Sequence, residues 1–266
     1  MSRVFITGST TGLGMMAAAA LASQGHQVVL HARNPRRAAD AWHSLPTAEA
    51  LVTGDLSIIA GIRKVAEQVN RLGRFDAVIH NAGVYVDSQK RRVETADGLP
   101  YMFTVNALAP YILTALIERP QRLVYLSSGM HRGGTADLAD IEWRKRTWDG
   151  TAAYSDSKLH ALLLAFAVAR YWRGVFSNAV DPGWVPTRMG GPQAPDDLDE
   201  GYRTQVWLAV SDDAAAHVSG KYFHHMHQRA ADPVVNSEST QNQFIEICAR
   251  LSGIELDKSD PRFQGD

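Results

Sequence analysis

The chain of 266 residues contains a single cysteine, Cys248, so no disulfide can form within it. A chain with one thiol suits a reducing compartment, and we expect a cytoplasmic protein. It also lacks any apolar run near the roughly 18 residues of a membrane-spanning helix, and its first residues do not join a basic end to a long apolar core. These absences argue against secretion and against insertion into a membrane.

Neither sign of charge is in excess, with 27 lysines and arginines against 28 aspartates and glutamates. The basic residues are scattered, and only "RNPRR" and "KRR" form short clusters. A nucleic-acid surface needs a more continuous basic stripe. We therefore expect neither a nucleic-acid nor a membrane partner.

What the chain has instead is a regular alternation of short apolar strands and helices. Strands are expected over 3–7, 26–32, 49–55, 75–83, 122–128 and 175–183, and helices over 12–25, 35–45, 57–73, 99–118 and from Tyr154 onward. Ser57 is the expected N-cap of the third helix. Because parallel neighbours need a crossover connection, these steps predict an α/β fold. We expect one doubly wound Rossmann-type domain over 1–266, with about seven mostly parallel strands and helices on both faces.

The glycine-rich stretch "TGSTTGLG" follows the first strand and opens the first helix. Glycine removes the Cβ that would keep a pyrophosphate away from the backbone, and a helix N-terminus offers free N–H groups and a positive dipole end. Glycines that merely make a tight turn are the alternative, but the strand–loop–helix context favours a dinucleotide site. Its expected residues are Gly8, Thr10, Thr11, Gly12, Leu13 and Gly14.

Tyr154 and Lys158 stand four residues apart, so both project from one face of the expected helix, and no other tyrosine of the chain has a lysine at this spacing. A phenol with a pKa near 10 needs about 4 kcal/mol of preferential phenolate stabilisation to exchange protons near pH 7. An exposed lysine supplies at most about 1 kcal/mol. The pair therefore indicates catalysis in a closed cleft of low dielectric.

Several motifs in the same order resemble the short-chain dehydrogenase/reductase family over residues 3–187. They are "TGSTTGLG" for TGxxxGxG, "DLS" at 55–57, "HNAG" at 80–83 with His80 in place of an asparagine, Asn106, "SS" at 127–128, Tyr154-xxx-Lys158, and "DPGWVPT" at 181–187 for PGxxxT. The resemblance implies an oxidoreductase that transfers hydride between a nicotinamide and a carbonyl or alcohol.

The resemblance also implies a role for each matching residue. Tyr154 would be the general acid and base, Lys158 would bond the nicotinamide ribose, Ser128 would polarise the carbonyl, and Asn106 would hold a helix kink and a water. Ser127 would point to the other side of the strand. The remaining implied cofactor residues, besides Tyr154 and Lys158, are Asp55, Leu56, Asn81, Ala82, Gly83, Pro182, Gly183, Val185 and Thr187.

The end of the second strand indicates which nicotinamide cofactor is preferred. NAD-specific sites usually place a carboxylate there, whereas this chain has Ala32 followed by Arg33. A guanidinium can bind a 2′-phosphate through charge-assisted bonds worth about 1.5 to 3 kcal/mol. We expect NADP(H), with NAD(H) accepted at lower preference. A solvated Arg33 is the alternative, and whether Arg37 assists stays open.

The chain departs from the ordinary family pattern between Ser128 and Tyr154, which are 26 residues apart, about double the usual interval. With "TADGLPYMFTVN" and "YSDSKL", this spacing is similar to the retinol dehydrogenase and protochlorophyllide reductase branch and to bacterial ketoreductases. That likeness implies a bulky apolar substrate. The insert of about 129–152 is expected to form a pocket wall, its Trp143 and Trp148 either anchoring the loop or touching substrate.

Further pocket candidates are Tyr85, Met130, Trp184 and Met189, each of which could equally be ordinary packing, and residues 187–202 form an expected lid loop. "YFHHMHQ" contains three histidines but no thiolate or carboxylate at ligand spacing, so no metal is expected. The expected helix from Tyr154 to Tyr171 is apolar nearly all round, and the enzymes that the chain resembles pair this helix and the one after Pro100 across a two-fold axis. Together these predict a homodimer or homotetramer.

Two alternative functions stay open. One is an NADP-linked alcohol dehydrogenase that works mainly in the oxidative direction. The other is a non-catalytic dinucleotide sensor, which would be expected to lack Tyr154 or Lys158.

Overall fold

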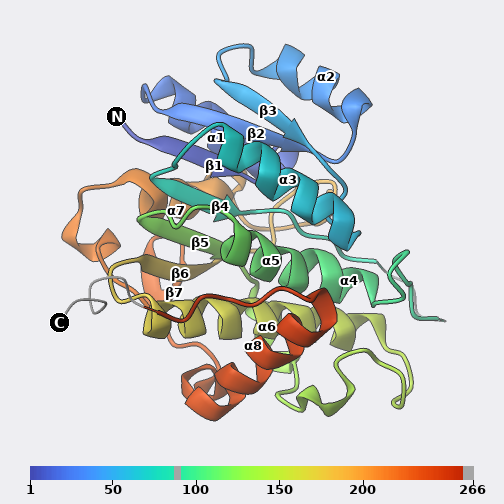
Figure 1. Ribbon diagram of the computed structural model, residues 1–266. Coiled ribbons are helices and arrows are strands. Elements are labelled where there is room, and N and C mark those ends of the chain that lie inside the picture. The colour runs from blue at the N-terminus through green and yellow to red at the C-terminus, as the bar shows by residue number, and fades with distance from the viewer. Residues whose placement is uncertain (87–90, 260–266) are drawn as a thin grey trace.

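The computed structural model describes residues 1–86 and 91–259, so 87–90 and 260–266 of the expected domain lie outside the described residues. The described chain forms one eight-stranded sheet in the order β3-β2-β1-β4-β5-β6-β7-β8 (Figure 1). Only β8 is antiparallel to its neighbour. The strands are β1 (Arg3–Ile6), β2 (Gln27–Ala32), β3 (Ala50–Thr53), β4 (Ala77–His80), β5 (Arg122–Leu126), β6 (Phe176–Asp181), β7 (Lys221–His224) and β8 (His227–Arg229).

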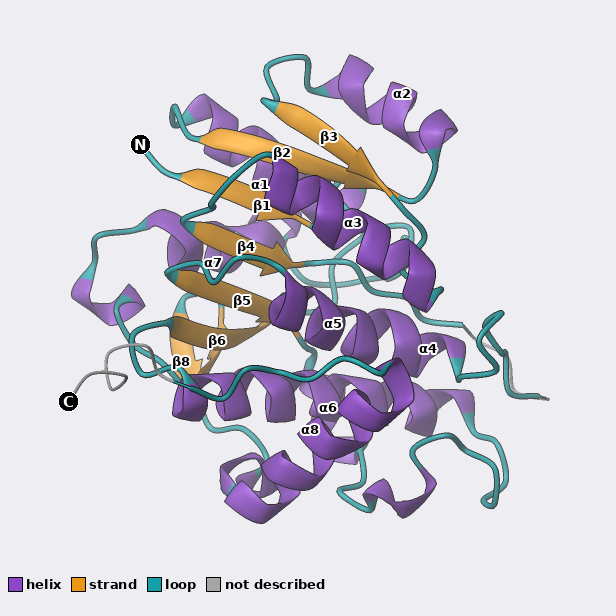
Figure 2. Ribbon diagram, in the orientation of Figure 1, coloured by secondary structure: helices purple, strands orange, loops and turns teal. Residues whose placement is uncertain are grey.

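Helices cover both faces of this sheet (Figure 2), as expected for a doubly wound fold. Apolar residues of α1, α2 and α7 fill the core on one face, and those of α3, α5, α6 and α8 fill the core on the other. The Rossmann-type prediction is confirmed, with one strand more than the seven or so expected. The helices are α1 (Gly12–Ser23), α2 (Pro35–Ser44), α3 (Ile59–Arg71), α4 (Tyr101–Phe103), α5 (Ala109–Leu116), α6 (Gly150–Tyr171), α7 (Leu198–Val210) and α8 (Glu238–Ser252).

The direction of strand order reverses at β1, which lies between β2 and β4. In open sheets of this kind, ligands bind beyond the carboxyl ends of the strands at such a switch point. The glycine-rich loop follows β1 and the segment 81–83 follows β4, so both lie at this point. The fold therefore places the cofactor candidates where the sequence predicts them.

Three local predictions differ from the structure. Ser57 is not the N-cap of α3, because its hydroxyl donates to Asp55 Oδ1 at 2.7 Å; the N-cap is Ile58, and Asp97 accepts the Ile59 N–H at 2.8 Å. The predicted helix 99–118 is interrupted by a π-helical segment, Thr104–Leu108, between α4 and α5, where the resemblance implied a kink held by Asn106. Helix α6 begins at Gly150, four residues before Tyr154, because Asp149 caps it.

Beyond residue 183 the sequence pattern led to no expected elements, and the structure adds α7, β7, β8 and α8 there. The stretch "YFHHMHQ" forms the hairpin of β7 and β8. His225 and Met226 make its two-residue turn with φ of 48° and 61°. Such turns require positive φ and usually signal themselves by Asn-Gly or Asp-Gly, so this hairpin carries no ordinary sequence signal.

The apolar character of α6 is accounted for within the chain. Helix α8 packs against α6, and the segment after it crosses α5 and α6 (Figure 1). Tyr111 donates to the Ile254 carbonyl at 2.8 Å, and Trp172 Nε1 donates to the Asp257 carbonyl at 2.7 Å. Among the described helices, none is long and apolar enough to cross a membrane.

Candidate active site

The glycine-rich loop adopts a backbone that only glycine fits easily. Gly8 and Gly12 have φ of 63° and 58°. A Cβ on Gly8 would lie 2.8 Å from Ala82 Cα, and one on Gly14 would lie 2.4 Å from Asn81 Nδ2. Within the described part of the chain, the atom nearest to a Cβ on Gly12 would be Thr187 Cγ2 at 4.0 Å. A side chain there would enter the space between this loop and the Thr187 loop, which fits a cradle for a pyrophosphate.

The segment after β4 fastens this cradle. Asn81 Nδ2 donates to the Thr7 and Gly8 carbonyls at 3.0 and 3.2 Å, and the Ala82 N–H donates to Thr7 Oγ1 at 3.0 Å. A Cβ on Gly83 would lie 3.3 Å from Lys158 Nζ. The "HNAG" motif therefore connects the glycine-rich loop to the expected catalytic lysine.

His31 is a positioning residue that was not among the residues expected from the sequence. Its Nδ1 accepts the Gly8 N–H at 3.0 Å, so Nε2 carries the proton that is donated to the Gly54 carbonyl at 2.9 Å. Burial lowers the pKa of His31 to about 4. The neutral ring ties the glycine-rich loop to the end of β3. One histidine inside an apolar strand gives no signal of this.

His80, the departure from the family asparagine, points into the core. Its Nε2 lies 3.2 Å from Thr114 Oγ1, and its ring stacks on Tyr125 with centroids 4.7 Å apart. Burial lowers the pKa of His80 to about 3. The first position of the motif thus supports the fold beneath the site and does not face the cradle.

Arg33 lies beside the expected adenine residue. Its Nε donates to Asp55 Oδ2 at 2.8 Å, while Asp55 Oδ1 accepts the N–H and hydroxyl of Ser57 at 2.9 and 2.7 Å. Burial acts to raise the pKa of Asp55, but the bonds from Ser57 and Arg33 outweigh it and lower the pKa. Leu56 is buried, and the Arg33 side chain remains 59% exposed, within reach of a ligand. For Arg37, the structure shows its backbone N–H bound to Asn34.

The loop after β6 lies opposite the glycine-rich loop. The Gly183 N–H donates to Asp181 Oδ1 at 3.0 Å, Val185 is buried, and Thr187 Oγ1 accepts the Gly190 N–H at 3.2 Å. The Trp184 N–H donates to Asp196 Oδ2 at 2.6 Å, which closes the loop on itself. The expected lid loop of 187–202 overlaps α7, which begins at Leu198, and its role as a lid stays a prediction.

Tyr154, Ser128 and Lys158 converge at the carboxyl ends of β5 and β6. Ser128 lies close enough to the Tyr154 hydroxyl to lower its pKa, and Lys158 Nζ lies 5.5 Å from the centre of the Tyr154 ring. Lys158 Nζ donates to the Leu126 carbonyl at 3.0 Å. Ser127 points the other way, toward the Lys158 carbonyl at 2.8 Å. Of the serine pair, only Ser128 contacts the tyrosine.

Tyr154 and Lys158 are buried deeply enough for the pKa of each side chain to shift. Burial raises the pKa of Tyr154 to about 12, although Ser128 opposes this. Burial lowers the pKa of Lys158 to about 8, and the Asp181 carboxylate opposes this. The chain alone thus holds Tyr154 as a neutral proton donor at pH 7. A second positive charge in the cleft would favour the phenolate.

Asn106 lies in the π-helical segment and joins three parts of the site. Its Oδ1 accepts the Val84 N–H at 2.8 Å, and its Nδ2 donates to the Val84 carbonyl and to Ser157 Oγ at 3.0 and 2.9 Å. Ser157 Oγ donates in turn to the Tyr154 carbonyl at 2.7 Å. Asn106 therefore fixes the chain after β4 against the turn of α6 that carries Tyr154.

The insert contributes an aromatic wall beside the tyrosine. Trp143 is 7% exposed and packs with Met102, Ala153 and Tyr154, so it anchors the insert. Trp148 is half-buried and meets Trp143 edge-on with ring centroids 5.2 Å apart. Large apolar side chains are exposed on the segments that follow β4, β5 and β6, namely Tyr85, Met130, Trp184 and Met189. Tyr85 meets the Tyr154 ring edge-on at 5.0 Å.

A Rossmann-type sheet with a glycine-rich loop at its switch point, and a buried tyrosine and lysine beside a half-buried serine, defines a class of dinucleotide-linked oxidoreductases. A family model described as short chain dehydrogenase matches residues 2–198. The chain therefore belongs to the short-chain dehydrogenase family, and it is an oxidoreductase of that family.

Similar proteins cover nearly the whole chain. An uncharacterized oxidoreductase of Emericella nidulans is 42% identical over 96% of this chain and 98% of its own length. Human retinol dehydrogenase 13 is 30% identical over 95% of this chain and 85% of its own. An uncharacterized protein of Mycobacterium paratuberculosis has a solved structure with a TM-score of 0.81 and 25% identity, covering 96% of this chain and 95% of that one.

Proposed function

We propose that this protein is an NADP(H)-dependent reductase of ketones or aldehydes carried on a bulky, apolar skeleton of aromatic, polyketide, quinone or retinoid type. The observation that carries the proposal is the placement of the buried Tyr154 beside Lys158 and the half-buried Ser128, with exposed apolar side chains on the segments that follow β4, β5 and β6. The name of the human relative, retinol dehydrogenase 13, points to the same kind of substrate.

The residues of the cleft fit the cofactor. The glycine-rich loop and the N-terminus of α1 would hold the pyrophosphate, Arg33 the 2′-phosphate, and Asp55 and Leu56 the adenine. Residues Asn81–Gly83 and Pro182–Thr187 would enclose the nicotinamide half, with Lys158 on its ribose. When bound, NADPH supplies the hydride. NAD(H) would be accepted at lower preference, because it lacks the phosphate that Arg33 binds.

The chain's own residues would handle the proton. The Ser128 hydroxyl donates to the substrate carbonyl oxygen and orients it toward Tyr154 Oη. Tyr154 then gives its proton to that oxygen as the alcohol forms, and the Lys158 ammonium stabilises the phenolate that remains. The apolar wall excludes water, which strengthens both interactions. Asn106 keeps Tyr154 in register with the chain after β4.

The test is a panel of apolar ketones and aldehydes with NADPH absorbance as the measurement. We expect turnover in the wild type, and a loss of at least 100-fold in kcat in Tyr154→Phe, because removing a general acid costs about 10² to 10⁴ in rate. NADPH affinity should stay near normal, because only the hydroxyl is lost. Tyr171→Phe, a change far from the cleft, is the matched control. Near-normal turnover in Tyr154→Phe would contradict the mechanism.

The same residues can run the reaction toward oxidation, and then the protein works as an NADP-linked alcohol dehydrogenase. A non-catalytic dinucleotide sensor would bind NADPH and turn over none of the panel. We further place the protein in the cytoplasm, with no metal, nucleic acid or membrane partner. Measuring reduction of one ketone and oxidation of its alcohol separates a reductase, an alcohol dehydrogenase and a sensor that catalyses neither reaction.

A further inference from the structure

Asp156 is a buried carboxylate that the proposed reaction does not use. It lies two residues after Tyr154 on α6, and its side chain is only 3% exposed. Burying a charge without partners costs several kcal/mol, so such a group persists only where it is paired. Burial raises its pKa, while its hydrogen-bond partners oppose the rise. The identity of those partners shows what Asp156 does.

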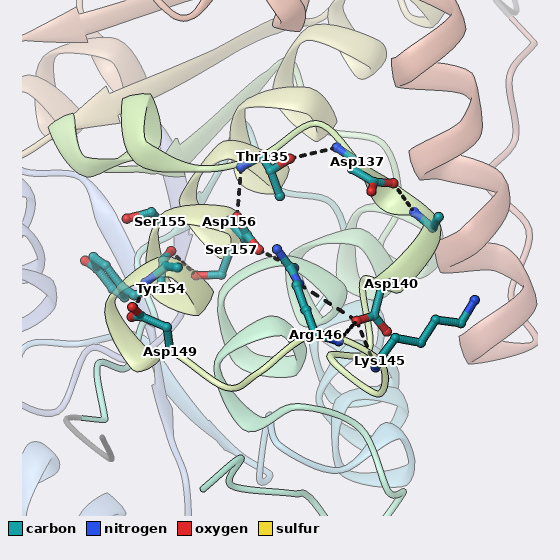
Figure 3. Close-up of polar contacts among 12 residues, drawn as sticks. Thr135, Asp137, Asp140, Lys145, Arg146, Asp149, Tyr154, Ser155, Asp156 and Ser157 are labelled. Carbon is teal, nitrogen blue, oxygen red and sulfur yellow. Dashed lines mark hydrogen bonds and ion pairs between the residues drawn. The ribbon is translucent and has the colours of Figure 1, made fainter. Parts of the chain in front are cut away.

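Two hydrogen-bond partners of the Asp156 carboxylate, Thr135 and Arg146, come from the insert between β5 and α6 (Figure 3). The Thr135 N–H donates to Asp156 Oδ1 at 2.8 Å, and Arg146 donates to Oδ2 at 2.5 Å. The Trp143 side chain is also close enough to lower the pKa of Asp156. The Arg146 guanidinium also lies over the Trp143 ring, 3.5 Å from its centre. One carboxylate of the catalytic helix thus holds both the beginning and the end of the insert.

The insert is shaped for this contact. Asp140 accepts the N–H groups of Lys145 and Arg146, both at 3.0 Å (Figure 3), and that of Arg144 at 2.7 Å. These bonds fix the turn that presents Arg146. Trp143 has a φ of 53°, a left-handed conformation that is strained for a bulky residue. Strain of this kind costs about 1 to 3 kcal/mol and persists where the surroundings hold it. The stacking of Arg146 on the Trp143 ring and the packing of that ring provide this support.

The contacts of Asp156 with Thr135 and Arg146 form a clamp on the insert, and the clamped insert reaches Tyr154. Trp143 packs with Tyr154, and Trp148 packs against the same cluster while remaining half-exposed. Without the Asp156–Arg146 pair, Trp143 would lose both its stacking partner and the support for its backbone. The wall formed by Trp148 would then no longer have a fixed distance from Tyr154.

We propose that Asp156 and Arg146 are positioning residues that hold Trp148 as a fixed wall for flat, fused-ring carbonyl substrates. This inference rests on the proposed reductase function. A ketone of two or more fused rings would lie against the Trp148 face with its carbonyl at Tyr154. A small ketone needs no such wall. The clamp therefore sets selectivity by substrate size and leaves the proton transfer itself unchanged.

The first experiment tests the clamp without any substrate. Hydrogen exchange is measured by mass spectrometry on the wild type, Arg146→Met, and the control Arg144→Met, which removes an exposed ion pair with Glu142 in the same loop. We expect exchange over 135–149 to rise at least tenfold in Arg146→Met alone, with exchange of the glycine-rich loop unchanged. Asp156→Asn should behave like Arg146→Met. Equal protection of 135–149 in all proteins overturns the clamp.

The second experiment tests selectivity, with NADPH and two probes, the bicyclic ketone 1-tetralone and the small diketone 2,3-butanedione. In Arg146→Met, kcat/KM for 1-tetralone should fall about tenfold through KM, while the value for butanedione changes less than twofold. Arg146→Lys, which keeps the charge, should recover part of the loss. An equal loss on both probes, no loss on either, or a wild type that reduces butanedione but not 1-tetralone overturns the selectivity role. A wild type that reduces no carbonyl refutes the proposed function, and hydrogen exchange still decides the clamp.

Discussion

At the scale of single residues, Arg33 determines the cofactor prediction. Arg33→Ala should weaken NADPH binding about tenfold to hundredfold, since charge-assisted bonds are worth about 1.5 to 3 kcal/mol. Arg33 also holds Asp55 in place, so a small loss for NADH is expected as well. The measurement is kcat/KM for both cofactors at fixed ionic strength, because salt screens exposed charges.

Arg36→Ala, in the same basic cluster, is the control, and Arg37→Ala tests whether that residue assists. A wild type that already prefers NADH, or an Arg33→Ala protein that loses both cofactors equally, would show that Arg33 does not bind the phosphate.

The second prediction for a single residue concerns His31 and the dependence of the free energy of unfolding on pH. The folded pKa of His31 is about 4, against 6.5 for a histidine side chain in water. As the pH falls, the unfolded chain therefore takes up the proton before the folded chain does. The contribution of His31 to the free energy of unfolding is fully present above pH 6.5 and is lost as the pH falls toward 4. Between pH 7.5 and 5 this histidine alone removes about 2 kcal/mol from the free energy of unfolding.

Urea unfolding of the wild type and His31→Gln at the two pH values isolates this contribution from those of His80 and His160. The wild type should lose about 2 kcal/mol more than the variant over this interval. Equal losses in both proteins would mean that His31 is protonated in the folded state.

At the scale of elements, the alternation of strands and helices before Asp181 could be predicted because each carries its own period and turn signal. The irregular helix at Asn106 was implied, as a kink, by the family resemblance but not by the local pattern, since its cause is the tertiary contact of that amide with Val84 and Ser157. The cap of α3 by Asp97 is likewise a contact between distant residues. The hairpin at His225 is missed because the usual turn residues are absent.

The site divides in the same way. Tyr154, Lys158, Ser128 and the glycine-rich loop belong to motifs with a recognisable spacing. The contacts of His31 with Gly8 and of Asp156 with Arg146 join residues that no motif relates, so only the fold brings them together.

At the scale of the whole molecule, the dimer or tetramer predicted from α6 depended on an apolar surface in need of a partner. In the structure, α8 and residues 253–259 cover α6 and the adjoining α5. Ile254 and Leu256 of this segment are themselves buried, at 6% and 4% exposed. Pairing of two chains through α5 and α6 would require this cover to move. We therefore expect a monomer of 29.2 kDa by sedimentation at micromolar concentration.

A double variant, Ile254→Asp with Leu256→Asp, tests the role of the cover. Two buried carboxylates should lift the segment from α5 and α6 and expose apolar surface, so this protein should sediment at a higher mass than the wild type or precipitate. Glu255→Gln, a change at an exposed residue of the same segment, should leave the mass unchanged. A wild-type dimer or tetramer would support the prediction made from sequence, and its interface would then have to be sought outside the covered faces of α5 and α6.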